Sequence, residues 1–327
     1  MQVQEQYRPG AIQSTRDLGG AYNLNVLIRA SRGSFVVRVY RPWVTPERLL
    51  GIQKIKRRLH AAGIPVVLPL TVINGNTFIE IDQRLAEVEG YIPNQERPPA
   101  VKHYEVSASI LGRLHAALGG FAQIPEIPPP EVENYSLPVD LEAGLARVRS
   151  RIEMAQAEGR SQALNICALV ESSLPYITEE WQRLGQYLPR QLVHGDFGPG
   201  NILFDQDQPA AIGDFDFINV HERIFDLAYM LFWMLERLEP DLPYNRRSWK
   251  GPGTIIQNYQ AAMGQPLTAG ERKFLPVEMA RVPLHWIAEA AYLPDPVGAV
   301  LSSQERVEFA RWILEQKEKA FRFMEFG

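Results

Sequence analysis

The sequence predicts an α+β fold of two lobes, a small antiparallel β-rich lobe followed by a large, mainly helical lobe. Two observations lead to this prediction. Short strand-like apolar runs fill much of the chain up to residue 92, and helical spacing of apolar residues takes over from residue 98. The stretch between them, 93–99, holds three prolines and is typical of a short hinge. We therefore expect an N-terminal lobe at residues 1–95 and a C-terminal lobe at residues 96–327.

Turn and cap signals place the elements of the N-terminal lobe. Ser31-Arg32-Gly33 and Asn74-Gly75 each lie between two strand-like runs, and Asn-Gly is a strong signal for a tight hairpin turn. Thr45 suits the N-cap of a helix that has Pro46 at its first position and ends at Gly63. The strands expected from these signals are 21–28, 34–40, 66–73, 77–81 and 84–92.

The C-terminal lobe is expected to hold one compact β section among its helices. Ile110, Leu111, Leu114 and Leu118 follow helical spacing, and Gly119-Gly120 ends that helix. Further helices are expected at 140–158, 162–187, 222–238, 252–263, 268–292 and 302–326, with the β section at 191–217.

Composition and charge exclude several classes of protein. Of the 327 residues 46% are hydrophobic, and the formal net charge of −4 argues against a general binder of nucleic acid or anionic membranes. No segment approaches the roughly 18 uninterrupted apolar residues of a membrane span, and no secretory signal is visible. Cys167 is the single cysteine, so no internal disulfide can form. The cytoplasm is the simplest localisation, and the sequence does not indicate an oligomeric state.

The most informative stretch is a polar loop between two apolar strands. It has the pattern H-G-D-x-x-x-x-N from His194 to Asn201, and a second acidic loop, Asp214-Phe215-Asp216, follows it. Asp214 lies 13 positions after Asn201, a gap that two short strands with a tight turn near 207–209 would fill. Such a hairpin would bring Asn201 and Asp214 to the same end.

These residue types suit phosphoryl transfer. That reaction needs an acceptor hydroxyl held in line and charge on the phosphates neutralised, usually by magnesium. Magnesium prefers hard oxygen ligands, which the Asp214 carboxylate and the Asn201 amide would supply. Asp196, a further carboxylate, would orient the hydroxyl and accept its proton.

The two loops resemble those of the aminoglycoside phosphotransferase and choline kinase-like family, which has the two-lobed protein-kinase-like fold. The resemblance implies a kinase with ATP as co-substrate and Mg²⁺ as cofactor. In it, Asp196 matches the catalytic base, Asn201 and Asp214 match the magnesium ligands, and His194 matches the structural histidine of the loop. Asp226 matches an aspartate that braces the catalytic loop from the following helix.

The N-terminal part resembles the same family in two places. The stretch 18–23, with Gly19, Gly20 and Asn23, lies where the family has its nucleotide-covering loop. Arg38 lies where a strand presents a basic residue to the α- and β-phosphates, and an arginine can bind phosphate through two parallel hydrogen bonds.

The hinge and the first helix complete the expected nucleotide site. Glu89 and Tyr91 lie in the strand that leads to the hinge, whose free backbone groups would bind the edge of adenine. The family's helix supplies a glutamate as partner of the basic residue, but this chain has Ile52 or Gln53 at that position. Glu47 lies about a turn and a half too early to replace it.

Structural interpretations compete with several of these assignments. The pair Gly19-Gly20 also fits an ordinary hairpin turn, and Arg38 also fits a solvated strand residue. Asp216 suits a metal or substrate site and, equally, a structural hydrogen bond. His115 lies on an apolar helix face and is expected to be a core histidine.

Three functions remain open at this stage. The first is a kinase for a hydroxyl of a small metabolite, with no nucleic acid or membrane as partner. The second is a more specific assignment, either a homoserine kinase of the type that shares this fold or an aminoglycoside phosphotransferase. The third is a kinase-like protein that binds nucleotide without turnover, an alternative supported by the absent helix glutamate.

The acceptor is expected to be a small metabolite because residues 241–327 show no acidic bias that would attract a polycation. One stretch without Lys or Arg argues for a cationic acceptor; its acidic residues are Glu126, Glu131, Glu133, Asp140 and Glu142.

Overall fold

The structure, a computed structural model, describes residues 2–20, 23–93, 100–120, 127–131, 133–238, 242–247 and 249–326. Its contacts divide the chain into two compact units. Unit 1 comprises Met1–Arg97, Gly120–Val132 and Gly200–Asn219, and unit 2 comprises Pro98–Gly119, Glu133–Pro199 and Val220–Gly327. The stretch 200–219, which we expected in the C-terminal lobe, therefore groups with the β-rich unit. Most of the expected hinge, residues 94–99, lies outside the described residues.

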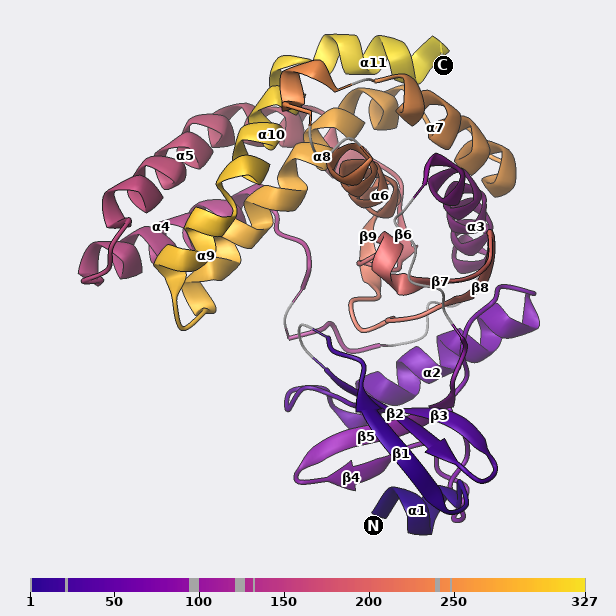
Figure 1. Cartoon of the computed structure of the whole chain (residues 1–327). Helices are drawn as coiled ribbons and strands as arrows, with labels where there is room; N and C mark the ends of the chain where they lie inside the picture. Colours follow the sequence, from indigo (N-terminus) through magenta and orange to yellow (C-terminus); the bar gives the residue numbers. More distant parts are fainter. Residues whose placement is uncertain are drawn as a thin grey trace. The chain divides into compact units, whose positions relative to one another are not determined.

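Unit 1 is built on a five-stranded antiparallel sheet with the strand order β1-β2-β3-β5-β4 (Figure 1). Its strands are β1 (Ile12–Asp17), β2 (Leu24–Ala30), β3 (Gly33–Val39), β4 (Ile79–Ile81) and β5 (Arg84–Gly90). Strands β2 and β3 pair from Leu24 opposite Val39 to Ala30 opposite Gly33, so the predicted turn after Ala30 is confirmed.

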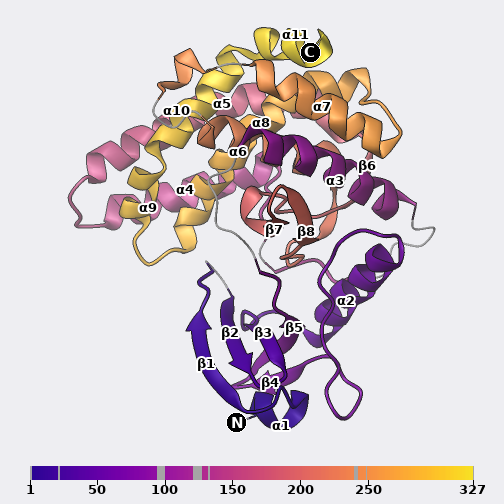
Figure 2. The same cartoon turned by 45° about the vertical axis from the view of Figure 1, so that its right-hand side comes forward.

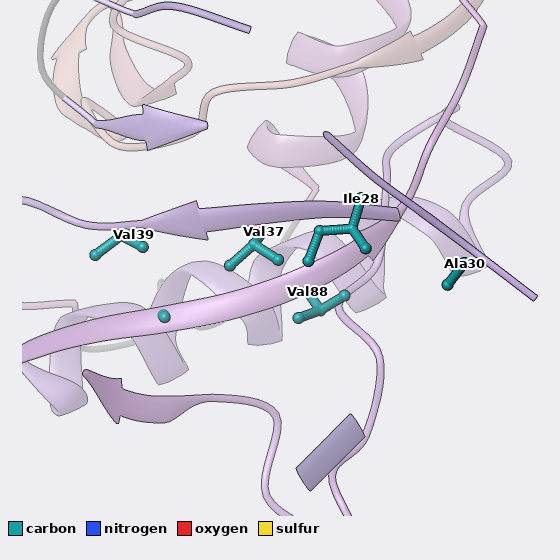
Figure 3. Packing of buried hydrophobic residues seen from close by; sticks show 6 residues of the cluster. Ile28, Ala30, Val37, Val39 and Val88 are labelled. Atoms are coloured by element: carbon teal, nitrogen blue, oxygen red, sulfur yellow. The ribbon is translucent and has the colours of Figure 1, made fainter. Parts of the chain in front are cut away.

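One face of this sheet is apolar because alternate residues of β2, β3 and β5 turn towards it. The buried cluster on this face consists of Ile28, Ala30, Val37, Val39, Ala86 and Val88 (Figure 3). Val3 and Tyr7 of helix α1 (Gln2–Tyr7) pack against the cluster. The opposite face presents Arg38 and Glu87, which lie directly opposite each other in the β3–β5 register.

Helix α2 (Pro46–Ala61) lies on that opposite face, and its predicted start is confirmed. The Thr45 hydroxyl accepts a hydrogen bond from the Arg48 amide at 3.3 Å, and Pro46 takes the first helical position. Such a cap stabilises a helix by about 1 kcal/mol. Leu49 of α2 packs with Tyr40, which directly follows β3, and with Leu85 of β5, and so anchors the helix.

Residues 200–219 join unit 1 through a β-hairpin. Strands β7 (Ile202–Asp205) and β8 (Gln208–Ile212) pair antiparallel, as predicted. The Ile212 amide donates to the carbonyl of Pro65 at 2.7 Å, and Ile212 also forms an isolated bridge with Val66. The hairpin is therefore attached to the segment that follows α2.

Several elements differ from those that the sequence predicted. Residues 66–73 do not pair with β4 as a strand, because they form only single bridges at Val66 and Pro69, although the Asn74-Gly75 turn is present. Helix α1 and strand β1 were not expected, since their residues are mostly polar and exposed. The single helix expected at 302–326 is broken at Ser303 and Gln316.

Unit 2 is mainly helical, with a small two-stranded sheet of β6 (Arg190–Val193) and β9 (Asn219–Glu222). Its helices are α3 (Val101–Gly119), α4 (Pro138–Met154), α5 (Arg160–Arg183), α6 (Ile224–Arg237), α7 (Lys250–Met263), α8 (Ala269–Glu289), α9 (Pro296–Ser302), α10 (Gln304–Glu315) and α11 (Lys317–Phe326).

Helices α3 and α7 lie side by side (Figure 2). A Cβ atom on Gly112 of α3 would lie 2.4 Å from the carbonyl oxygen of Tyr259 in α7, so only glycine permits this close approach. Among the described ranges, no helix is both long and apolar enough to cross a membrane.

Candidate active site

A braced loop after β6 carries Asp196. The loop turns at Gly195, whose φ of +82° favours glycine. Asp226 of α6 accepts hydrogen bonds from the amides of His194 and Gly195 at 2.7 and 2.8 Å. The prediction that Asp226 braces this loop from the following helix is therefore confirmed. His194 is fully buried, and its ring nitrogen lies 3.3 Å from the Asp196 amide.

A buried histidine completes the brace. His115 of α3 contacts the Asp226 carboxylate through Nε2 and the Tyr259 hydroxyl through Nδ1, both at 2.9 Å. Burial alone would raise the pKa of Asp226, but the hydrogen bond from His115 and the loop amides lower it, so the carboxylate stays charged. His115 is a core histidine, as expected, and it also orients the brace.

Two residues that the sequence did not point to surround the Asp196 carboxylate. Asn134 donates to Asp196 Oδ1 at 3.2 Å and also to the carbonyl of Gly195. The Tyr229 hydroxyl is hydrogen-bonded to Asp196, and burial together with this carboxylate raises the pKa of Tyr229 well above its usual value. Neither residue has a spacing signal, because their proximity to Asp196 arises only from folding.

The hairpin β7–β8 brings Asn201 and Asp214 to the same end, as predicted. Ile202 lies opposite Ile212, and the Gly213 amide donates to the Asn201 carbonyl at 2.8 Å. Asp214 has a φ of +56°, an uncommon backbone conformation for a residue other than glycine.

In unit 1, Arg38 meets both acidic residues of the second loop. Its guanidinium lies 2.6 Å from Asp214 Oδ1 and 3.9 Å from Asp216 Oδ1. Burial alone would lower the pKa of Arg38, but the two carboxylates raise it well above the usual value. Asn23 donates to the other oxygen of Asp216 at 2.5 Å, so a structural hydrogen bond at Asp216 is present. Arg38 is therefore not a solvated strand residue.

The oxygen donors at this end of the hairpin fit a magnesium ion. Asp214 offers a partly exposed carboxylate, and Asn201 offers an amide oxygen. Magnesium is usually bound by one or two protein groups, with phosphate oxygens and water completing its shell. Within the described part of the chain, no group of three or more His, Cys, Asp or Glu side chains could hold a metal. This donor set therefore suits a metal that is shared with a phosphate-bearing ligand.

Helix α2 has the reverse of the charge pattern that the family resemblance implies. Gln53 donates to Glu87 of β5 at 2.7 Å, and Lys56 lies 2.5 Å from Glu89 and 3.6 Å from Glu87. The Tyr40 hydroxyl donates to Glu87 at 2.6 Å. The helix thus supplies an amide and a cation, and the carboxylates come from the sheet. Arg38 takes its acidic partner from the Asp214 loop instead.

Replacing Lys56 by Met is expected to lower the free energy of unfolding by about 3–5 kcal/mol, because it leaves two buried carboxylates without their shared cation. Urea denaturation of both proteins measures the difference. Lys54→Met, an exposed position on the same helix, is the control and should change stability by less than about 0.5 kcal/mol. Similar stabilities for Lys56→Met and the control would contradict the prediction.

The loop between β1 and β2 holds the remaining candidates for nucleotide cover. Gly19 and Gly20 have φ values of +75° and +137°, and the Asn25 side chain donates to the Gly19 carbonyl at 3.1 Å. Ala21 and Tyr22, also part of the predicted loop, lie outside the described residues. The glycines therefore lie in the connection between the paired strands β1 and β2, and phosphate cover by this connection remains a prediction.

Glu89 lies near the end of β5 and Tyr91 directly follows the strand, but some of their polar groups already have partners within the protein. The Glu89 side chain pairs with Lys56, and the Tyr91 amide donates to the Ser34 carbonyl at 3.0 Å. Nucleotide contacts from this strand would therefore involve other backbone groups of the same stretch.

The sequence model of the phosphotransferase enzyme family matches residues 14–262. A homoserine kinase from Brucella anthropi is 24% identical over 316 residues, which cover 94% of this chain and 89% of the relative.

Solved structures of small-molecule kinases have the same fold. The structure of a microcompartment-associated aminopropanol kinase superimposes with a TM-score of 0.72 at 14% identity, covering 95% of this chain and 96% of that one. An amicoumacin kinase in complex with AMP-PNP and Ca²⁺ gives a TM-score of 0.69 at 16% identity, covering 97% and 92%. The predicted kinase-like fold class is confirmed.

Proposed function

Because the chain belongs to the phosphotransferase enzyme family, we propose that it is a small-molecule kinase that transfers the γ-phosphoryl group of ATP to a hydroxyl group. The observation that carries this proposal is the braced loop that holds Asp196. Asp226 fixes the loop backbone, while Asn134 and Tyr229 orient the carboxylate. A carboxylate fixed in this way can position a hydroxyl and accept its proton.

The chemistry assigns one role to each group. The acceptor oxygen bonds to the γ-phosphorus, the bond to the β-phosphate oxygen breaks, and the hydroxyl proton passes to Asp196. Asn201 and Asp214 would hold Mg²⁺, which neutralises charge on the phosphates when it is bound. Arg38, with Gly19, Gly20 and Asn23 of the neighbouring loop, would contact the phosphates. The cytoplasm, which supplies ATP, is the compartment we propose.

Adenine is expected to lie against the stretch from Glu89 to Ile92. Since the Tyr91 amide is bonded to Ser34, we expect the backbone of Gly90 and Ile92 to meet the purine edge. A crystal structure with a non-hydrolysable ATP analogue and Mg²⁺ tests this assignment. A base that lies more than one or two residues away from this stretch would contradict it.

For the acceptor we propose a small hydroxyl metabolite, and homoserine is its narrower form. The support is the similarity to a homoserine kinase over 94% of this chain. An aminoglycoside acceptor is disfavoured because, as a polycation, it needs a surplus of carboxylates around its site, and residues 241–327 show no acidic bias.

A panel of acceptors tests the function. With Mg-ATP present, kcat/KM is measured for homoserine, choline, sugar alcohols and kanamycin-type aminoglycosides. We expect the highest value for a small metabolite and a value at least about 10²-fold lower for aminoglycosides, which corresponds to roughly 3 kcal/mol of discrimination. Efficient phosphorylation of kanamycin would overturn the choice of acceptor. Tight Mg-ATP binding without turnover of any acceptor would favour the non-catalytic alternative.

A further inference from the structure

Asn134, the partner of Asp196, lies in a segment that belongs to no helix or strand. Residues 133–137 run irregularly into α4. Asn134 donates to Asp196 Oδ1 and to the Gly195 carbonyl, both at 3.2 Å. Because the segment lacks the backbone hydrogen bonds of a helix or sheet, its position depends on contacts with neighbouring side chains. The orientation of the proposed base therefore depends on what holds residues 135–136.

Arg281 of α8 contacts both residues that follow Asn134. Only 4% of its surface is exposed. Its guanidinium donates to the carbonyl of Ser136, and the guanidinium carbon lies 4.8 Å from the centre of the Tyr135 ring and 5.1 Å from that of Trp181. A planar guanidinium that stacks on aromatic rings while it donates hydrogen bonds is held in one orientation. Arg281 therefore fixes a backbone group and a ring of the same short segment.

Further side chains from β9 and α8 hold the same two residues. The Tyr135 hydroxyl donates to Glu222 of β9 at 2.5 Å, and its ring stacks on that of His221 with 4.1 Å between the ring centres. The Ser136 hydroxyl is hydrogen-bonded to Nδ1 of His285 at 2.7 Å. Each of these contacts holds one residue of the segment, whereas the guanidinium on α8 contacts both.

The ion pair that holds Arg281 is costly to bury. The guanidinium lies 2.6 Å from the carboxylate of Glu278, which is 1% exposed. Burial raises the pKa of Glu278 to about 7, although Arg281 opposes this rise, and the Glu222 carboxylate adds to it. A buried ion pair is often no more stabilising than apolar residues of the same volume. Stability alone therefore does not explain the pair, and carboxylates perturbed in this way are frequent at functional sites.

We propose that Arg281 is a positioning residue of this active site. It holds the Ser136 carbonyl and the Tyr135 ring and thereby keeps Asn134 within hydrogen-bond distance of Asp196. All of these residues lie in unit 2. The inference rests on the proposed function, because it assigns a further residue to the same reaction. Since Arg281 is buried, it acts through Asn134 and not on the substrate.

The main test replaces the buried ion pair as a whole, in the variant Glu278→Leu/Arg281→Met. Removing one partner would leave an uncompensated charge, whereas replacing both by apolar residues of similar size often keeps or raises stability. We expect kcat to fall by about 10–10²-fold, because a small displacement of a catalytic group can cost about 10²-fold in rate. The affinity for Mg-ATP, measured by calorimetry, and the melting temperature should stay close to those of wild type.

Glu180→Leu/Arg183→Met is the matched control. It removes an ion pair of the same i,i+3 spacing from α5, where the Arg183 side chain is 52% exposed. This control should keep the kcat of wild type. If the buried-pair variant keeps it as well, Arg281 has no positioning role, and the proposed kinase function stands unchanged.

A double-mutant cycle shows whether Arg281 acts through Asn134. Asn134→Ala should itself lower kcat, and adding the buried-pair replacement to it should lower kcat little further, because coupled residues do not contribute independently. Effects on kcat that simply multiply would mean that the two residues act separately, which would contradict the proposal.

If the buried-pair variant does not fold, Arg281→Lys provides the test. Lysine keeps the charge beside Glu278 but lacks the planar fork that also donates to Ser136. We expect kcat to fall by a few-fold in this variant, again with Mg-ATP affinity retained. A folded Arg281→Lys protein with the kcat of wild type would remove Arg281 from the positioning of Asn134.

A structural measurement makes the test independent of turnover. The side-chain amide signal of Asn134 in NMR spectra, identified by its absence in Asn134→Ala, should move in the Arg281 variants and stay in place in the control. An unmoved signal would overturn the positioning role even if kcat falls. A wild-type protein that phosphorylates no hydroxyl would overturn the proposed function, and the same signal would still decide whether Arg281 holds Asn134.

Discussion

Asp196→Asn is expected to lower kcat by about 10²–10⁴-fold, the usual contribution of a positioned general base. The amide of the new side chain can still accept hydrogen bonds from Asn134 and Tyr229, so the loop should keep its geometry. It cannot accept the proton of the acceptor hydroxyl at neutral pH. Affinity for Mg-ATP should remain nearly unchanged, because the proposed role of Asp196 concerns the acceptor and not the triphosphate.

Steady-state kinetics with the best acceptor and calorimetry with Mg-ATP measure these two quantities for Asp196→Asn. Asp205→Asn, an exposed aspartate at the end of β7, serves as the control and should keep wild-type values. Turnover within a few-fold of wild type would remove Asp196 from the mechanism. A matching loss of Mg-ATP affinity would show that the substitution disturbs more than the proton transfer.

Asp214→Ala is expected to weaken Mg-ATP binding and turnover together. Removing a residue that only hydrogen-bonds to a metal ligand usually lowers metal affinity by about 10–100-fold. Asp214→Ala removes a proposed direct ligand, so its loss of metal affinity should be larger. A second consequence follows from the ion pair with Arg38. The substitution releases that guanidinium from its partner at 2.6 Å, so ATP without metal should bind at least as tightly as it binds wild type.

Titrations of ATP with and without Mg²⁺ test both consequences of Asp214→Ala, again with Asp205→Asn as the control. Equal Mg-ATP affinities for wild type and Asp214→Ala would mean that the metal is held elsewhere. If Asp214→Ala also loses affinity for metal-free ATP, the loop has collapsed. That result would contradict the prediction, which expects weaker binding of Mg-ATP only.

Local signals were sufficient for much of the fold. Thr45 and Pro46 predicted the start of α2 because capping depends on neighbours along the chain. The spacing between Asn201 and Asp214 predicted the hairpin β7–β8, since a tight turn fixes the pairing of its flanking strands. The order and spacing of His194, Asp196 and Asn201 likewise indicated phosphoryl transfer, because they resemble the catalytic loop of a known kinase-like family.

Elements that depend on distant partners were harder to predict. Strand β1 alternates poorly and is exposed, and only its pairing with β2 makes it a strand. Residues 66–73 have the composition of a strand, yet they bridge to Ile212 and Glu89 instead of forming a ladder with β4. Asn-Gly predicts a turn but not whether the flanking residues pair.

The sequence by itself determined the fold class, the candidate base, the candidate metal ligands and the absence of a helix glutamate at 52 or 53. Only the tertiary structure decided which charged and polar side chains meet. Arg38 pairs with Asp214, Lys56 pairs with Glu89, and Asn134 contacts Asp196. The physical reason is that a motif depends on residues a few positions apart, whereas a buried charge takes whichever opposite charge the fold brings within a few ångströms.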